Sequence, residues 1–167
     1  MTGCGMDPFS TQLNEMLVNT YRSVQAIEEA MLVSLSGDNL SISEMHTIEA
    51  IGDGGPDGRT ITDIAQALDI SPPSVTMMVK RLEKKGFVHK ARCERDGRRI
   101  YVRLTELGRR ADISHRFFHR QMVRAVGRSI PEAEKAALLH GLKALNEFFE
   151  KRALELMPKS PDGGADS

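Results

Sequence analysis

The sequence lacks the features of a secreted or membrane protein. Its 167 residues include only two cysteines, Cys4 and Cys93, which lie far apart. The first residues have neither the basic start nor the apolar stretch of a signal peptide. No apolar run approaches the roughly 20 residues that a membrane-spanning helix needs. These absences favour a reducing cytoplasm and predict no membrane partner.

Motifs typical of enzymes are missing as well. The chain has no nucleophile elbow, Walker motif, dinucleotide fingerprint or cluster of cysteine ligands. The glycine-rich stretch GDGGPDG at 52–58 is not followed by Lys-Ser or Lys-Thr, so we interpret it as a flexible connector and not as a phosphate-binding loop. The protein is therefore predicted not to be an enzyme and to require no cofactor.

Charge is distributed unevenly along the chain, although the formal net charge is zero. Residues 1–79 carry 2 Lys/Arg against 11 Asp/Glu, residues 80–110 carry 12 against 4, and residues 111–167 carry 9 against 8. A net charge of zero does not reveal that acidic and basic residues lie in different parts of the sequence. The middle segment, with a net charge of plus eight, predicts a polyanionic partner.

Two helices are predicted before the connector. Residues of an apolar stripe recur every three or four positions in the first, over about 10–35, namely Leu13, Leu17, Tyr21 or Thr20, Val24, Ile27 and Met31. This narrow apolar stripe suits a contact between helices. Ser41 and Glu44 form a capping box that begins the second helix, which is predicted to end at Gly52.

The next two helices are predicted to form a helix-turn-helix. The first has one apolar face, made of Ile61, Ile64, Ala65 and Leu68. Ser71 is a natural N-cap for the second, Pro72 suits its first position, and Gly86 is the expected stop. Only Asp69 and Ile70 separate the two helices. A helical hairpin with no role in DNA binding is the alternative interpretation.

The pattern changes to that of paired strands after Gly86. Residues 87–93 and 100–104 are predicted to pair, with an Asp-Gly turn within the sequence ERDGRR. A hairpin this basic would repel itself in water, whereas DNA phosphates would relieve the repulsion. An arginine at the tip suits the negative potential of a narrow minor groove. We therefore predict that the hairpin is a wing.

Two long helices are predicted to close the chain. One runs from Thr105 to about Gly127, and the other begins at a Ser129 cap, followed by Pro131 and Glu132. The first, fifth and sixth helices would expose apolar stripes in a monomer, so we expect them to form a homodimer interface.

The predicted fold class is mainly α with a small β-wing. A winged helix-turn-helix core is expected at about 41–105, with dimerisation helices at about 10–35 and 106–157. These parts make one domain over 10–157. The tail at 158–167, PKSPDGGADS, is rich in Pro, Gly and Asp and is expected to be disordered.

Two stretches are specific enough to indicate a family. One is SPPSVTMMVKRLEKKGFV, and the other is the wing sequence DGRRIYVRLT that begins at Asp96 and is followed by Gly108. Over about 10–157 the chain thereby resembles the MarR family of bacterial transcription regulators. The resemblance implies a homodimeric winged helix on a near-palindromic DNA operator, with recognition helices in major grooves and wings in the flanking minor grooves.

Candidate DNA contacts follow from this resemblance and from the helix-turn-helix pattern. Residues on the second short helix are expected at base edges and phosphates, Arg98 would enter the minor groove, and Asp96 would brace a nearby arginine. The predicted set is Ser71, Ser74, Thr76, Met77, Lys80, Arg81, Arg92, Arg95, Asp96, Arg98 and Arg99. A sequence-independent architectural DNA-binding protein is the alternative, with an affinity that falls steeply with salt and ignores sequence.

Three further stretches indicate a subfamily. IEEAMLVSL, SISEMHTIEAIG and HRFFHRQMV are similar to repressors of fatty-acid biosynthesis operons in low-GC Gram-positive bacteria. That resemblance implies long-chain acyl groups on acyl carrier protein as the effector. Arginines recur every four residues on one face of the fifth helix, at Arg116, Arg120, Arg124 and Arg128. They would suit an acidic carrier protein, or they form only a solvated basic face.

The histidines raise a competing hypothesis. His115 and His119 are four residues apart, the spacing at which two imidazoles on a helix share a metal ion. With Glu28 and His46 they resemble the primary zinc site of zinc-responsive MarR regulators. The second site of those sensors is incomplete here, where Ser34, Met45 and Ser114 stand at its positions. Alternatively, the histidines pack beside Phe118 and Met122 and bond to the backbone or to Glu28.

Cys93 suggests a third mode of sensing. A thiolate near Lys90, Arg92 and Arg95 would have a lowered pKa, and its oxidation would disturb the wing. The peroxide sensors of the family place their reactive cysteine near the start of the first helix, where this chain has none.

Overall fold

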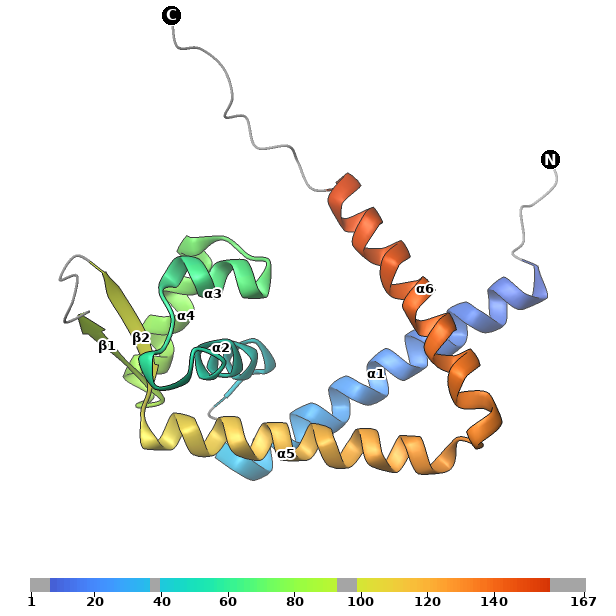
Figure 1. Cartoon of the computed structure of the whole chain (residues 1–167), viewed down its shortest axis with the longest axis horizontal. Helices are drawn as coiled ribbons and strands as arrows, with labels where there is room; N and C mark the ends of the chain where they lie inside the picture. The colour runs from blue at the N-terminus through green and yellow to red at the C-terminus, as the bar shows by residue number, and fades with distance from the viewer. Residues whose placement is uncertain (1–6, 37–39, 93–98, 157–167) are drawn as a thin grey trace, which may run out of the picture. The chain divides into compact units, whose positions relative to one another are not determined.

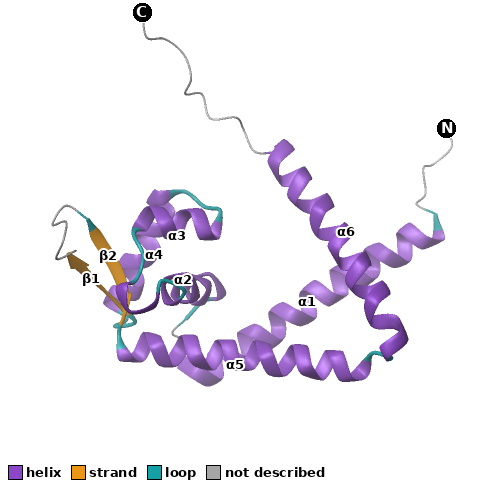
Figure 2. Ribbon diagram, in the orientation of Figure 1, coloured by secondary structure: helices purple, strands orange, loops and turns teal. Residues whose placement is uncertain are grey.

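The protein is mainly helical, with a two-stranded antiparallel sheet that forms a wing, in the computed structural model shown in Figure 1 and Figure 2. The structure describes residues 7–36, 40–92 and 99–156. The elements in chain order are α1 (Pro8–Ser36), α2 (Ile42–Gly52), the 3-10 helix η1 (Gly55–Asp57), α3 (Ile61–Leu68), α4 (Pro72–Lys84), β1 (Val88–Arg92), β2 (Ile100–Leu104), α5 (Glu106–Ser129) and α6 (Glu132–Leu156). The predicted fold class is confirmed.

The chain falls into two compact units, Met1–His119 and Arg120–Ser167. The first holds α1 to α4, the strands and the start of α5, and the second holds the end of α5 and α6. None of the helices within the described ranges combines the length and apolar character needed to span a bilayer.

Local capping interactions begin α2 and α3. Ser41 Oγ accepts a hydrogen bond from the Glu44 amide at 3.2 Å, and Glu44 Oε2 accepts one from the Ser41 amide at 2.9 Å. The predicted capping box of α2 is thus confirmed. A second capping box, formed by Thr60 and Asp63, begins α3 and was not predicted.

The turn between α3 and α4 is as short as the sequence predicts. Asp69 has a left-handed backbone conformation with φ 53°, and its amide donates to carbonyls in the last turn of α3. An aspartate tolerates this conformation better than most residues. Ser71 caps α4 by accepting from the Ser74 amide at 3.4 Å. After this turn, α4 runs in a new direction, and the apolar face of α4 packs into the hydrophobic core.

The hydrophobic core lies in the first unit, under the helix-turn-helix. Its members come from α1, α2, α3, α4, both strands and the start of α5. The buried apolar residues are Leu32, Leu40, Met45, Ile48, Ala50, Ile51, Ile64, Ala65, Val75, Val79, Leu82, Phe87, Val88, Val102, Leu104 and Ala111. Because helices and hairpin share one core, the position of the wing is fixed relative to α4.

The wing is a two-stranded sheet with one further bridge at its base. β1 pairs with β2 in register from Val88 opposite Leu104 to Arg92 opposite Ile100. Arg59 adds an isolated bridge to Val102, with N–O distances of 2.8 and 3.1 Å. Gly58, which precedes Arg59, lies so close to β2 that a Cβ at this position would overlap the Val102 carbonyl. The stretch at 52–58 is therefore more than a connector, because it carries η1 and leads into this bridge.

The sequence LTELG forms the junction between wing and α5. Thr105 Oγ1 donates to the Gly86 carbonyl at 2.7 Å and accepts from the Gly108 amide at 3.1 Å. A Cβ at Gly108 would overlap the carbonyl oxygen of Phe87. These contacts explain why a threonine stands at 105 and a glycine at 108. Both residues allow α5 to begin close to the segment that follows α4.

Ser129 does not begin α6, contrary to the prediction. Its hydroxyl donates to the Val126 carbonyl at 2.8 Å, so it belongs to the last turn of α5. In the first turn of α6 the Glu134 amide donates to the carbonyl of Pro131. A serine hydroxyl can bond backward or forward along a chain, and spacing alone did not distinguish these possibilities.

Candidate nucleic-acid interface and histidine cluster

Helix α4 has a fully buried face and an exposed face. Val75, Val79 and Leu82 are completely buried in the core. The opposite side carries the residues predicted to contact DNA. Of these, Ser71, Ser74, Met77, Lys80 and Arg81 are exposed, and Thr76 is half-buried. Met77 is 52% exposed and is therefore accessible to a partner.

Three hydroxyls on this face are partly engaged in local hydrogen bonds. Thr76 Oγ1 donates to the carbonyl of Pro72 at 2.9 Å, and Ser71 Oγ lies 2.9 Å from Ser74 Oγ. A hydroxyl has one donor and two acceptor sites, so each retains capacity to form another hydrogen bond. Ser71 also caps the helix, so its replacement would affect stability as well as any DNA contact.

Of the twelve cations of residues 80–110, Arg95 and Arg98 lie outside the described residues, Arg99 is exposed at the base of the wing, and the other nine divide into two groups. Five form ion pairs with acidic side chains: Lys85 with Glu44 at 2.7 Å, Lys90 with Glu83 at 3.1 Å, Arg103 with Asp57 at 3.8 Å, and Arg109 and Arg110 with Glu106 at 2.9 and 3.3 Å. Within the described ranges, Lys80, Arg81, Lys84 and Arg92 are exposed and have no ion pair. The surplus charge is thus partly neutralised inside the fold, and the remainder concentrates on α4 and β1.

The tip of the wing lies outside the described residues, and with it Cys93, Arg95, Asp96 and Arg98. At the base of the wing Arg99 is exposed and acts on Asp63 of α3. The pKa of Asp63 is lowered, chiefly by hydrogen bonds from Thr60 and to a lesser extent by the charge of Arg99.

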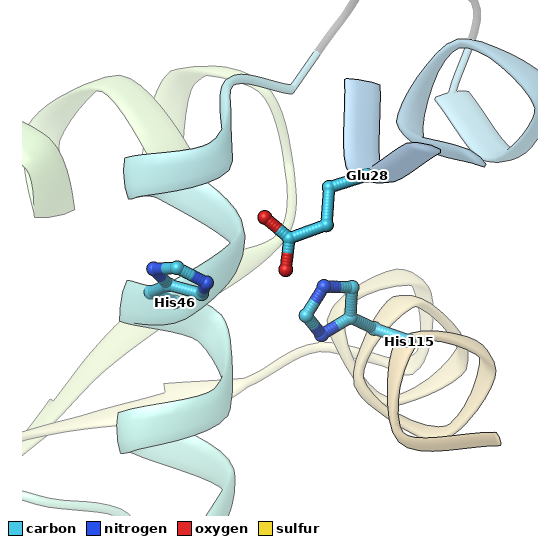
Figure 3. A group of neighbouring side chains, drawn as sticks. All are labelled: Glu28, His46 and His115. Atoms are coloured by element: carbon cyan, nitrogen blue, oxygen red, sulfur yellow. The ribbon is translucent and has the colours of Figure 1, made fainter. Parts of the chain in front are cut away.

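A cluster of histidines and a carboxylate lies in the first unit. One ligand atom each from Glu28 of α1, His46 of α2 and His115 of α5 can be chosen so that all lie within 4.8 Å of one another. Figure 3 shows the Glu28 carboxylate directed toward the space between the two imidazoles. Glu28 and His115 are 7% and 1% exposed. This His/Glu cluster could hold a metal ion.

His119, the fourth predicted ligand, borders the cluster. Its Nε2 lies 3.3 Å from Nε2 of His115 and 3.2 Å from Oε1 of Glu28. The alternative interpretation, that the histidines pack beside Phe118, also has support. The centroid of the Phe118 ring lies 5.4 Å from that of His119 and 6.5 Å from that of His115. Apolar packing and a polar cluster therefore coexist on adjacent faces of α5.

The donor set fits a zinc ion. Imidazole and carboxylate groups are ordinary zinc ligands, and their burial would exclude competing water. The positions of a second site do not fit: Met45 is completely buried in the core, and Ser34 and Ser114 offer hydroxyls only. The structure thus favours one candidate centre and no paired site at those positions.

Glu49, which the sequence pattern did not single out, contacts His115. Nδ1 of His115 lies 2.8 Å from Oε1 of Glu49. Burial would raise the pKa of Glu49, but the contact with His115 and the charge of Arg116 outweigh burial, and the pKa is lowered. Glu49 follows His46 by three residues on a predicted helix, a spacing that could have indicated its position on the same side.

Arg116 joins α5 to the end of α2. Its Nε donates to Asp112 at 2.7 Å, and its Nη2 donates to Asp53 at 2.8 Å and to the Glu49 carbonyl at 3.1 Å. Burial raises the pKa of Asp112 despite its contact with Arg116. Arg116 is therefore occupied within the fold. The exposed members of the predicted arginine row are Arg120, Arg124 and Arg128, all in the second unit.

Comparisons with known proteins place this chain among transcription regulators. Residues 38–99 match the MarR family. The crystal structure of Streptococcus pneumoniae FabT in complex with DNA is similar, with 34% identity, a TM-score of 0.78, and coverage of 85% of this chain and 98% of that one. YfiV of Bacillus subtilis (strain 168), an uncharacterised HTH-type transcriptional regulator, is 28% identical over 156 residues, which are 87% of this chain and 96% of YfiV. The chain spans only about half (48%) of YhjH, another such regulator of that strain, with 26% identity over 86 residues.

Proposed function

This chain belongs to the MarR family of DNA-binding transcriptional regulators, which are not enzymes, and we propose that it is a homodimeric repressor of a near-palindromic operator. The observation that carries the proposal is the outward face of α4, where Lys80 and Arg81 are exposed without an ion pair in the described part of the chain. A helix of this kind fits the major groove, where side chains reach base edges.

Each part of the interface has a distinct role in the proposal. Ser74, Thr76, Met77 and Lys80 meet base edges, and Arg81 binds phosphate. On the wing, Arg92, Arg95 and Arg99 bind phosphate, while Arg98, braced by Asp96, enters the minor groove. Phosphate contacts set affinity and register, and base contacts set sequence preference.

Fluorescence anisotropy with a labelled operator tests this interface. Lys80→Ala should weaken operator binding and reduce the preference for the operator over an unrelated duplex, because Lys80 is proposed to meet base edges. The matched control is Lys143→Ala on α6, an exposed lysine that pairs with Glu147 at 3.8 Å. Equal affinity and sequence preference in wild type and Lys80→Ala would contradict the placement of α4 in the interface.

A homodimer would cover apolar side chains that one chain leaves exposed. α1 exposes Phe9, Met16 and Tyr21, and α6 exposes Phe148 and Phe149. Such residues are costly in water and are typical of an interface between subunits. Sedimentation equilibrium at micromolar concentration should give twice the mass of one chain, and a monomer would contradict the proposal.

The proposed regulated process is fatty-acid biosynthesis, with an acyl chain on acyl carrier protein as effector. The support is the sequence resemblance to repressors of those operons, together with the 34% identity to FabT. Arg120, Arg124 and Arg128 are exposed and supply a basic surface for an acidic carrier. Operator binding measured with and without long-chain acyl carrier protein tests this assignment, and unloaded carrier protein is the control.

The histidine cluster favours a second candidate function, zinc-dependent regulation. Glu28, His46, His115 and His119 would be the ligands, and a bound zinc ion would tie α1, α2 and α5 together. Since α2 and α5 share the core with α4, such a link would bias the position of the recognition helix. If zinc alters operator affinity and acylated carrier protein does not, the fatty-acid assignment is wrong.

A further inference from the structure

The two ring nitrogens of His115 face different surroundings. Nδ1 lies 2.8 Å from Oε1 of Glu49, and Nε2 lies 3.3 Å from Nε2 of His119. Figure 3 shows one nitrogen of His115 turned toward the Glu28 carboxylate and the other turned away from it. The nitrogen that faces away is the one that meets Glu49.

We propose that Glu49 holds the imidazole proton of His115 on Nδ1 and thereby leaves the lone pair of Nε2 directed into the cluster. An ionised carboxylate only accepts hydrogen bonds, so a nitrogen 2.8 Å from it is favoured in its protonated form. In a neutral imidazole the other nitrogen is then unprotonated. Glu49 is a positioning residue in this scheme and not a ligand.

Burial of Nδ1 makes this role of Glu49 more important. Apart from its 2.8 Å contact with Glu49 Oε1, the buried Nδ1 has no hydrogen-bond partner among the described residues. A buried polar group strongly favours such a partner, and the Glu49 carboxylate is within reach.

Glu49 is itself held in place from α5. Arg116 donates to the Glu49 carbonyl at 3.1 Å and to the Asp53 carboxylate at 2.8 Å, while Asp112 fixes the guanidinium from its own helix. The last turn of α2 is thus bound to the same helix that carries His115. This arrangement keeps the Glu49 carboxylate beside Nδ1.

For metal binding, this inference rests on the proposed zinc function. A metal ion needs the unprotonated nitrogen of a neutral imidazole. Carboxylates that receive the other N–H of a metal-bound histidine orient the ring and raise its basicity, and their loss typically weakens metal affinity about 10–100-fold. Glu49 would therefore set the affinity of a centre that it does not touch.

The first experiment uses the full-length protein without metal. Long-range proton–nitrogen NMR of nitrogen-15 histidine reports which ring nitrogen carries the proton, with His115 signals assigned by their loss in His115→Gln. Wild type should show the proton on Nδ1, Glu49→Ala should lose this preference, and Glu49→Gln should retain it because an amide oxygen still accepts. Glu83→Gln is the matched control, because it removes the same charge from a glutamate that pairs with Lys90 and not with His115.

The second experiment measures zinc affinity by competition with a chromophoric chelator. Glu49→Ala should bind zinc about 10–100-fold more weakly, Glu49→Gln should lose less, and Glu83→Gln should match wild type. The Glu49 side chain is 24% exposed, so its loss leaves a site that solvent can fill. Circular dichroism melting checks the fold, and Glu49→Gln decides the result if Glu49→Ala unfolds.

The outcomes separate the inference from the proposed function. If wild type binds no zinc, the zinc function is wrong, and the NMR result alone decides the role of Glu49. If wild type binds zinc but the Glu49 variants change neither the tautomer nor the affinity, the inference about Glu49 is overturned. A proton on Nε2 of wild-type His115 would overturn it as well.

Discussion

Charged side chains have opposite roles in two regions, the contact between α2 and α5 and the outward face of α4. Where α2 contacts α5, Arg116 pairs with Asp53 and Asp112, and His115 lies beside Glu49. On α4, Lys80 and Arg81 have no acidic partner within the described ranges. Charges paired inside a fold contribute to its geometry, whereas unpaired exposed charges remain available to another molecule. Net charge along the sequence does not distinguish these two uses.

The Glu44–Lys85 pair should give the largest effect, because it is an internal contact next to the recognition helix. Glu44 is 4% exposed, caps α2, and lies 2.7 Å from Lys85 at the end of α4. Glu44→Ala removes the cap and leaves Lys85 without this partner, so the free energy of unfolding should fall by about 2–4 kcal/mol. Urea denaturation measures it. A loss as small as that of an exposed pair would show that the two kinds of contact do not differ.

Removal of an intermolecular contact should reduce DNA affinity and leave stability unchanged. Arg98→Ala should weaken operator binding by roughly 1–3 kcal/mol, because the arginine is proposed to enter the minor groove. Binding titration, urea denaturation and sedimentation of the same sample separate these quantities. Full operator affinity in the variant would exclude the wing tip from the interface.

Acid should weaken the internal contacts selectively. The pKa of Glu44 is lowered: burial opposes this shift, but the hydrogen bonds from Lys85 and Ser41 and the charge of Lys85 together outweigh burial. A carboxylate with a lowered pKa stabilises the fold above its unfolded value, here about 4.5, and loses this contribution as pH falls through its folded value. Urea denaturation between pH 6 and pH 3.5 should show a smaller loss in Glu44→Gln than in wild type. An equal loss in both proteins would assign the pH dependence to other groups.

An exposed pair should have the smallest effect. Lys90 and Glu83 are 34% and 41% exposed, and their charged atoms lie 3.1 Å apart. Exposed pairs are worth about 0–1 kcal/mol, so Lys90→Ala should change the free energy of unfolding by no more than this. The same urea measurement applies, and a loss comparable to that of Glu44→Ala would contradict the ranking.

Features that depend on neighbouring residues were predictable from the sequence. The capping box of Ser41 and Glu44, the short turn at Asp69 and the antiparallel hairpin all occur as predicted. Each arises from backbone chemistry within a few residues. Ser129 was an exception, because its hydroxyl had a preceding carbonyl within reach as well as the helix that follows.

The sequence by itself determined the order of helices and strands, because periodicity and caps act over a few residues. Only the tertiary structure decided which charges are paired. Arg116 meets Asp53 across 63 positions, and Lys85 meets Glu44 across 41. No local pattern encodes a partner that distant, since packing of the shared core brings α2 against α4 and α5. The same packing placed Glu49 beside His115.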